Sequence, residues 1–386
     1  MNYRREIDGL RAIAVLPVIL FHAGFSLFSG GFVGVDVFFV ISGYLITTII
    51  VSEMQDNQFR LSVFYERRAK RILPALIVVV VSSVPLVWLF FTPLELHVYS
   101  GSLMSVATFS SNFFFWRSSG YFDASSELQP LLHTWSLAVE EQYYLLFPLG
   151  LMLVWRFNSK GLWVAISIAA VFSFSLSQWA VLHKPSAAFY LLPARGWELL
   201  VGSFAALYML GRRTAQASRA LAEVGSLLGM AMIACAIFLF DKKTAFPGVN
   251  ALIPTVGTAL IIVFSSENTW VGRALSARAL VGVGLVSYSA YLWHQPLFAL
   301  VQYQAHDGIA WWAALGLIGI VFVLAFITWK YVEEPVRKAK GLGGVESFCF
   351  LSGGYLLFFL WGCMGISMLI RWVTGTRKIK IKSYNT

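Results

Sequence analysis

The chain has 386 residues, of which 58% are hydrophobic and only 12% are charged. About a quarter of the residues in a soluble domain are charged, so this composition excludes a soluble globular protein and indicates a protein with many membrane spans. The formal net charge of +10 does not indicate nucleic-acid binding, because the basic residues form small clusters between apolar runs, as in the cytoplasmic loops of membrane proteins.

Apolar runs of spanning length predict eleven transmembrane helices and an all-α polytopic fold. They lie near residues 10–28, 32–52, 73–93, 137–155, 162–182, 193–211, 223–240, 251–265, 281–303, 310–331 and 348–372. The segment 95–130 is less apolar, and we expect a loop or a re-entrant element there. We expect one membrane domain over residues 1–340, followed over 341–386 by an additional transmembrane helix and a short basic tail.

The loop charges predict the orientation. With the N-terminus in the cytoplasm, most basic clusters fall in cytoplasmic loops, which is the usual arrangement. The C-terminus is then external, and its basic tail RKIKIKSYNT is the exception to the rule. The first apolar run carries polar residues and no cleavage site follows it, so we expect an uncleaved span. Cys235, Cys349 and Cys363 form no CxxC motif, so no metal site or disulfide framework is expected.

The first span carries Arg11 and His22, which lie about three helical turns apart and so point from one face, roughly 16 Å apart along the axis. Ionisable groups inside a span face a bundle interior or a wet cavity and mark functional paths. The alternative is an arginine that reaches the membrane surface and a hydrogen-bonded core histidine. A packing role for Arg11, in an ion pair with Asp36 or Asp8, also stays open.

The second span begins in the glycine-rich stretch GGFVGVDVFFVISG, whose small residues permit close helix packing. Asp36 in this stretch is a candidate for a substrate cavity, although a helix cap or an arginine partner is the favoured interpretation. Before the third span, Arg68 and Arg71 are one turn apart and project from one face. Their guanidinium groups suit a phosphate-rich ligand. Ordinary cytoplasmic charge or lipid-headgroup contact is the alternative.

The stretch LLHTWSLAVEEQYYLLFP places His133, Ser136 and Glu140 at the start of the fourth span. Carboxylates there are costly unless they have partners, and the aromatic and imidazole neighbours favour a functional role for Glu140 over a helix cap. In the sixth span, Arg195 and Glu198 are three residues apart and predict a structural ion pair. The stretch SYSAYLWHQPLF contributes further polar residues, and we expect them to line a cavity: Tyr288, Tyr291 and His294.

Taken together, these residues resemble the acyltransferase-3 family of bacterial integral-membrane O-acyltransferases, of the polysaccharide and O-antigen acetylase type. The matching motifs run in family order over about residues 6–340, and the ordered set is specific although each motif is weak alone. They are DGLRAIAV with His22 following, GVDVFFVISGYLIT, ERRAKRILPAL, HTWSLAVEEQYYL, RGWELLVG, SYSAYLWHQP and VEEPVRK. The resemblance implies a ten-helix acyltransferase bundle, to which the eleventh helix is added.

The resemblance implies an enzyme of the bacterial inner membrane that uses cytoplasmic acyl-CoA, usually acetyl-CoA. The acceptor would be a hydroxyl of a cell-surface glycan, most often lipopolysaccharide O-antigen, exopolysaccharide or peptidoglycan. We expect this glycan to be linked to a lipid, and the protein to lie among membrane lipids. The family's functionally important positions fall on Arg11, His22, Arg68, Arg71 and Glu140. We expect Arg68 and Arg71 to bind the CoA phosphates and His22 to act as general base. Glu140 is expected to orient or charge-compensate His22, and Arg11 to stabilise the donor or an oxyanion.

Other interpretations stay open at this stage. A proton-coupled transporter or flippase for a lipid-linked glycan also needs intramembrane Arg, His and Glu. A scaffold for glycan assembly accounts for the hydrophobicity but not for the ionisable residues. Whether an acylated enzyme forms is undecided. Family members with an eleventh helix usually carry an external SGNH hydrolase-like domain. No GDS-type serine motif occurs here, so we expect none in this chain, which is either a piece of a longer protein or one that dispenses with that domain.

Overall fold

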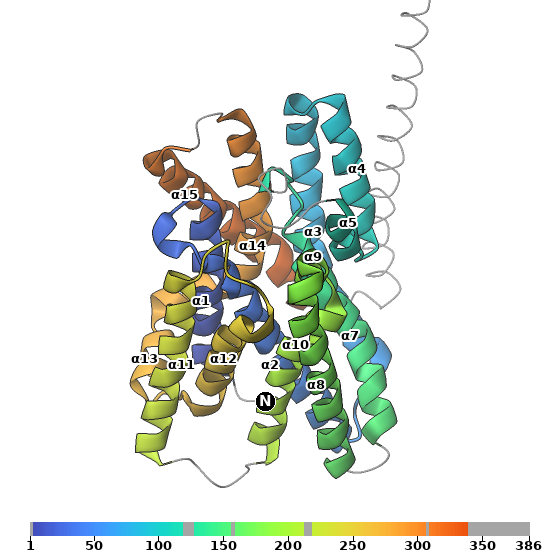
Figure 1. Ribbon diagram of the computed structural model, residues 1–386, viewed down its shortest axis with the longest axis vertical. Helices are drawn as coiled ribbons and strands as arrows, with labels where there is room; N and C mark the ends of the chain where they lie inside the picture. The colour runs from blue at the N-terminus through green and yellow to red at the C-terminus, as the bar shows by residue number, and fades with distance from the viewer. Residues whose placement is uncertain (1–2, 119–126, 156–158, 212–217, 306–308, 339–386) are drawn as a thin grey trace, which may run out of the picture.

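The structure, a computed structural model, describes residues 3–118, 127–155, 159–211, 218–305 and 309–338, and within these ranges it contains helices and no strand (Figure 1). The predicted all-α polytopic fold is therefore confirmed. The helices are α1 (Arg5–His22), α2 (Gly34–Gln55), α3 (Leu61–Phe90), α4 (Pro93–Ala107), α5 (Ser111–Ser118), α7 (Thr134–Trp155), α8 (Ser159–His183), α9 (Pro185–Tyr190), α10 (Leu192–Gly211), α11 (Arg219–Leu239), α12 (Leu252–Phe264), α13 (Trp270–Leu275), α14 (Arg278–Gln304), α15 (Trp311–Thr328) and α16 (Glu334–Lys338). Short 3₁₀ turns at Ser26–Phe28, Gly31–Val33 and Gly248–Ala251 and a π turn at Trp329–Glu333 connect some of them.

Each span predicted between residues 10 and 331 coincides with one helix, although the ends differ. Helix α1 ends at His22, before the predicted limit, because Gly24 adopts a positive φ of 85° that turns the chain. Helix α3 begins at Leu61, so the basic motif ERRAKR is part of the helix itself. The whole of the second predicted segment, 341–386, with its span 348–372 and its basic tail, lies outside the described residues.

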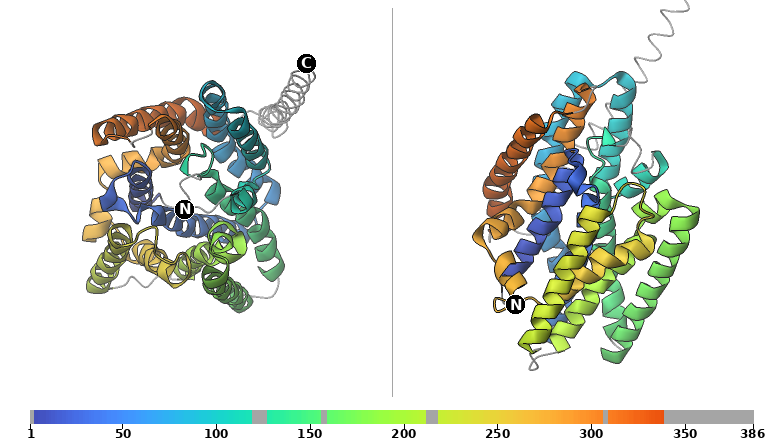
Figure 2. Two further views of the ribbon diagram at one scale, coloured as in Figure 1. Left: turned by 45° about the horizontal axis from the view of Figure 1, so that its top comes forward. Right: turned by 60° about the vertical axis from the view of Figure 1, so that its left-hand side comes forward.

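Six of the described helical stretches are long and apolar enough to cross a membrane: Gly31–Gln55, Leu61–Phe90, Thr134–Trp155, Gly161–His183, Arg219–Leu239 and Trp311–Lys338. The long helices α1, α10 and α14 are not among them, because they carry the charged and polar residues singled out in the sequence. Helix α1 packs against α14 and α2, and α10 packs against α2 and α8. In the views of Figure 2, α1 and α2 lie toward the middle of the bundle with later helices around them.

The less apolar segment 95–130, predicted as a loop or a re-entrant element, contains the two helices α4 and α5 in its described part. Helix α4 begins after Thr92, whose backbone N–H donates to the Glu95 carboxylate at 2.8 Å, so a capping box fixes its start. Helix α5 packs against α4, α7 and α9. The segment therefore forms a helical layer beside the upper half of α3 (Figure 1).

Glycines bring the polar helices into backbone contact. A Cβ atom on Gly43 of α2 would lie 1.9 Å from the carbonyl oxygen of Leu199 on α10. A Cβ atom on Gly284 of α14 would lie 1.9 Å from the carbonyl oxygen of Asp8 on α1. Only glycine permits such a close approach. For α2, the glycine-rich stretch of the second span had predicted this close packing. The close packing holds the polar faces of α1 and α14 against each other.

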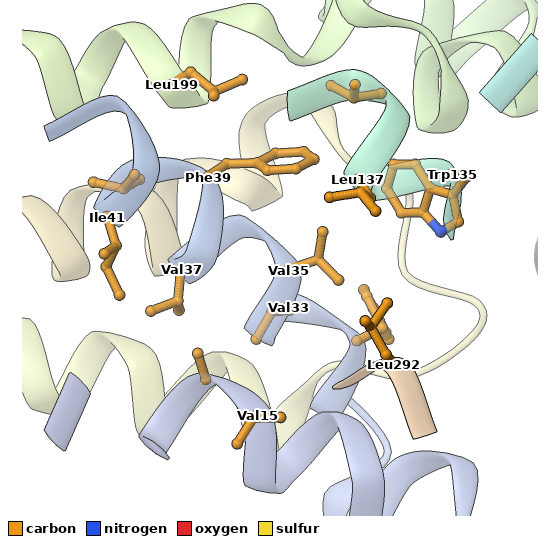
Figure 3. Close-up of a cluster of buried hydrophobic side chains, with 14 of the residues drawn as sticks. Val15, Val33, Val35, Val37, Phe39, Ile41, Trp135, Leu137, Leu199 and Leu292 are labelled. Carbon is orange, nitrogen blue, oxygen red and sulfur yellow. The ribbon is translucent and has the colours of Figure 1, made fainter. Parts of the chain in front are cut away.

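Around these contacts, apolar side chains from α1, α2, α7, α10 and α14 fill the centre of the bundle (Figure 3). Val15, Phe39 and Leu199 are fully buried, and Trp135 is 1% exposed. Packing of this kind fixes the positions of the neighbouring polar side chains, because a packed core deforms little. The polar residues described next are therefore held by a rigid frame.

Candidate active site

A narrow cavity of about 90 Å³ lies in the middle of the bundle, and we call it the central cavity. Helices α1, α2, α3, α7 and α14 contribute to its wall. Its polar side chains are Arg11, Ser42, Arg68, Arg71, Ser136, Glu140, Tyr144, Tyr288 and Tyr291, and most of the rest of the wall is apolar. Seven of these nine residues were singled out from the sequence, so the structure brings most of the predicted site into one place.

Arg68 and Arg71 enter the central cavity from α3, one helical turn apart as predicted. Neither forms an ion pair with a carboxylate within the part of the chain that the structure describes. The guanidinium of Arg68 lies over the Phe64 ring, 5.9 Å from its centre. By contrast, the adjacent basic residues Arg67 and Lys70 are bound to Glu53 and Glu66. The N–H donors of Arg68 and Arg71 are thus available to a ligand, whereas Arg67 and Lys70 of the same motif are paired with carboxylates.

Glu140 reaches the central cavity from the second turn of α7. Its carboxylate accepts hydrogen bonds from the hydroxyl of Ser42 at 3.0 Å and from that of Tyr144 at 3.2 Å. Because α7 begins at Thr134, Glu140 cannot cap the helix, and the alternative of a cap is wrong. The central cavity therefore contains a carboxylate held by two hydroxyls as well as the guanidinium groups of Arg68 and Arg71.

A wider cavity of about 450 Å³, the N-terminal cavity, joins the central cavity at Arg11, Leu45, Arg71 and Tyr288, which line both. Its other lining residues include Tyr3, Arg4, Asp8, Glu333 and Arg337, from the start of α1 and the end of the described chain. Arg11 donates to Asp8 at 3.3 Å, so of the two predicted partners Asp8 is the correct one. Arg71 and Arg11 therefore stand at the junction between a wide polar cavity and a narrow one.

His22 lies at the opposite end of α1, in a third cavity of about 380 Å³ that we call the His22 cavity. Its other polar residues are Ser26, Ser29, Glu127, Asp241, Lys242, Lys243 and Gln302. Lys242 is paired with Glu127, and the hydrogen bond from Thr244 holds the pKa of the exposed Asp241 below its ordinary value. The rim of this cavity is consequently charged and rich in hydrogen-bonding groups.

The ring of His22 has a defined tautomer in its neutral form. Its Nδ1 lies 2.8 Å from the carbonyl oxygen of Val18, which can only accept, so Nδ1 carries the proton. The lone pair is then on Nε2, and this nitrogen is the basic one. A histidine held in this way is suited to take a proton from a group in the His22 cavity.

A chain of ring contacts runs from His22 in the His22 cavity to Tyr291 in the central cavity. The His22 ring contacts that of His294 with centroids 5.1 Å apart, and His294 contacts His133 at 5.5 Å. Tyr291 contacts both of these histidines and donates its hydroxyl to the carbonyl oxygen of His133 at 3.0 Å. The same hydroxyl lies 2.7 Å from that of Ser136 in the central cavity. His133 and His294 were predicted to line a cavity, but neither is among the residues that line these three cavities: both rings are buried between His22 and Tyr291.

Two further expectations about the site need correction. Asp36 does not line any of these three cavities: it is fully buried, 3.1 Å from Arg195, which also pairs with Glu198 at 2.9 Å. Four aromatic rings surround that guanidinium, so Asp36 belongs to a structural ion cluster that includes the predicted Arg195–Glu198 pair. A carboxylate buried among apolar groups needs a counter-charge, and Arg195 provides it for Asp36.

Glu140 is also not the partner of His22. The hydrogen bonds of its carboxylate go to Ser42 and Tyr144, whereas His22 contacts Val18, Phe21 and His294. The two residues line different cavities. The expectation failed because spacing within one helix gives no information on the depth at which a second helix meets it.

Several residues at the site were missed in the sequence. Ser42 and Tyr144 hold Glu140, and the only signal for Tyr144 was its place one turn after that acid. Arg337 and Glu333 line the N-terminal cavity from the motif VEEPVRK, which the sequence marked only as the end of a span. Lys242 and Glu127 are 115 residues apart, so their pairing left no local pattern.

The sequence also matches known proteins. The profile of a family described as acyltransferase domain matches residues 4–330. The chain is 32% identical over 356 residues to the peptidoglycan O-acetyltransferase OatA of Listeria monocytogenes, covering 87% of this chain and 56% of that protein. It is 32% identical to the putative peptidoglycan O-acetyltransferase YrhL of Bacillus subtilis, covering 87% of this chain and 55% of that protein. It is 29% identical to the O-acetyltransferase OatA of Staphylococcus aureus, covering 91% and 59%.

The chain therefore spans little more than half the length of these curated relatives. No solved structure matches it. The apolar helices and the family match together identify a multi-pass membrane protein.

Proposed function

Because this chain belongs to the acyltransferase domain family, we propose that it moves an acetyl group from cytoplasmic acetyl-CoA to a hydroxyl of a cell-surface glycan. It would do so from the bacterial inner membrane, with its N-terminus in the cytoplasm. The names of the relatives support O-acetyl transfer as the reaction. The donor, the acceptor and the orientation are our inference from the site.

The observation that carries the proposal is the series of three cavities along α1. The N-terminal cavity and the central cavity share Arg11 and Arg71, and ring contacts from His22 through His294 to Tyr291 lead from the His22 cavity to the central cavity. A transferase that takes its donor from one side of a membrane and its acceptor from the other needs such a series. Arg11 and His22 lie roughly 16 Å apart along the helix, which sets the distance that the donor must reach.

The donor is matched to the first two cavities by size and charge. The N-terminal cavity, of about 450 Å³, has room for part of a nucleotide, whereas the central cavity, of about 90 Å³, admits only a thin chain. We assign the CoA phosphates to Arg71 and Arg68 and the pantetheine arm to the central cavity. Arg11 lies at the junction of these two cavities, so we assign it a contact with the donor. It is too far from His22 to stabilise an oxyanion there.

The acceptor is assigned to the His22 cavity. Its serines, lysines and carboxylates provide the donors and acceptors that sugar hydroxyls need. His22 Nε2 takes the proton of the attacking hydroxyl, whose oxygen then bonds to the thioester carbon as the carbon–sulfur bond breaks. Glu140 sets the charge of the central cavity and acts on the donor. The resemblance favours O-antigen as acceptor, and the names of the relatives make peptidoglycan the second acceptor to be tested.

The test uses the full chain in proteoliposomes with radiolabelled acetyl-CoA. O-antigen polysaccharide and soluble peptidoglycan fragments are supplied in separate reactions, and the label is measured in alkali-labile ester on the glycan. We expect transfer by wild type and by His183→Gln, and none by His22→Ala. Absence of transfer to both glycans would refute the proposal. Movement of unlabelled glycan across the vesicle, without ester formation, would instead support a transporter.

A further inference from the structure

The motif VEEPVRK contributes two residues to the N-terminal cavity that the proposed function has not used. They are Glu333 and Arg337, which lie four residues apart. A π turn at Trp329–Glu333 interrupts the helix here and leads into α16. Both the turn and α16 pack against α3, the helix that carries Arg68 and Arg71. The motif is therefore part of the donor side of the site.

A hydrogen bond fixes the position of the π turn. Ser289 of α14 is fully buried and donates its hydroxyl to the carboxylate of Glu333, which is also buried. Within the part of the chain that the structure describes, no ion pair joins Glu333 to Arg337. Arg337 follows Glu333 by one helical turn, on the same face, and is exposed. The backbone that carries Arg337 is thus anchored, while its guanidinium stays accessible to a ligand.

The other arginines of the N-terminal cavity differ in their partners. Arg4 donates to the carboxylate of Glu6, to a hydroxyl and to two backbone carbonyl oxygens, so its donors are occupied. Arg11 is paired with an aspartate. Arg71 and Arg337 have no carboxylate partner among the described residues. These two arginines are therefore the ones that an anionic ligand in this cavity would find free.

The arginines follow one another in the order of the phosphates of coenzyme A. Its diphosphate joins the pantetheine arm to the adenosine, and a separate monophosphate is bonded to the 3′ carbon of the ribose, beyond the diphosphate. Arg68 lines the central cavity alone, Arg71 lines both cavities, and Arg337 lines the N-terminal cavity alone. With the arm in the central cavity, as the proposed function on which this inference rests requires, the diphosphate meets Arg68 and Arg71. The ribose phosphate then lies in the N-terminal cavity.

We propose that Arg337 binds the 3′-phosphate of the donor and so selects coenzyme A over carriers that lack this group. A phosphate monoester carries between one and two negative charges near neutral pH and offers three acceptor oxygens. The planar guanidinium matches two of these oxygens with parallel N–H donors. Arg337 holds the nucleotide end of the donor at the cavity mouth, and the arginines of α3 hold the diphosphate. The binding step makes and breaks no covalent bond.

The test compares acetyl-CoA with acetyl-3′-dephospho-CoA, which differ in this phosphate alone. The full chain is assayed in permeabilised proteoliposomes as wild type, Arg337→Ala, Arg337→Lys and Lys338→Ala. Lys338→Ala is the matched control, because Lys338 is the adjacent basic residue of α16 and is paired with Glu334. Thermal unfolding of each variant is recorded beside the kinetics.

Wild type should have a KM for acetyl-CoA about tenfold or more below that for the dephospho donor, as a hydrogen-bonded charge pair provides. Arg337→Ala should raise KM for acetyl-CoA by that factor and leave KM for the dephospho donor within about twofold of wild type. Arg337→Lys should keep part of the preference, and Lys338→Ala all of it. An equal rise in KM for both donors would show a structural role and overturn the proposal. An unchanged preference would leave Arg337 in contact with lipid headgroups only and would also overturn it.

A binding measurement separates this inference from the proposed function. Unacylated coenzyme A and 3′-dephospho-CoA are titrated into the solubilised full chain. Wild type should bind coenzyme A more tightly by about the same factor, and Arg337→Ala should bind both with equal Kd. Equal Kd values in wild type would overturn the 3′-phosphate site. If wild type shows the preference in binding but transfers acetyl from neither donor, the proposed function fails while the 3′-phosphate site is supported.

Discussion

Arg71 is the residue whose removal tests the assignment of the donor most directly. It lines both the N-terminal and the central cavity, and it forms no ion pair with a carboxylate of the described chain. Its guanidinium is therefore available to the donor, and hydrogen bonds to charged groups contribute about 1.5–3 kcal/mol. Since about 1.4 kcal/mol is a factor of ten, Arg71→Ala should raise KM for acetyl-CoA by about 10- to 150-fold.

The assay is initial-rate kinetics with acetyl-CoA varied at saturating glycan. Arg71→Lys should recover only part of the loss, because an ammonium group lacks the planar fork of donors. Lys70→Ala is the matched control: it removes an adjacent basic residue of α3 that is paired with Glu66 at 2.7 Å, so KM should not change. If Arg71→Ala leaves KM at the wild-type value, the arginines of α3 serve topology only and the donor site is wrong.

Three further predictions follow from the same geometry. His22→Ala should lower the rate of acetyl transfer by about 10²-fold or more while the amount of the protein in the membrane stays normal; substantial residual ester on the glycan would show that His22 is not the catalytic base. Glu140→Gln should raise KM for acetyl-CoA by up to about tenfold without shifting the pH–rate profile, because Glu140 does not contact His22; a shifted profile would contradict the separation of the two residues. Gly43→Ala should destabilise the fold by about 1–3 kcal/mol or more, since its Cβ would lie 1.9 Å from a carbonyl oxygen, measured as a lower Tm; Gly150→Ala, with open space around it, is the control.

Sequence patterns were sufficient for the fold and for most of the polar residues of the central cavity. Apolar runs located the described helices, because the bilayer requires long apolar segments. Arg68 and Arg71 could be placed on one face because residues three apart in a helix point to the same side. Pairing between helices was less accessible. Asp36 pairs with Arg195, which is 159 residues away, and Glu140 binds Ser42 rather than His22. Such partners depend on the depth and rotation at which two helices meet, and these are set by packing contacts such as Gly43 against Leu199.

Two of the helices that a membrane accepts least readily, α1 and α14, contribute residues to the central cavity. Helices α1, α10 and α14 are not among the apolar spans, yet Arg195 of α10 and His294 of α14 are fully buried. Charged and polar groups are costly in lipid, so these helices require the more apolar ones around them. The outer helices thus have a chemical role as well as a structural one, because they exclude lipid from the buried polar residues of the bundle. A mutation that loosens that outer packing should therefore impair acyl transfer before it unfolds the protein, because the shape of the central cavity depends on how α1 packs against α14.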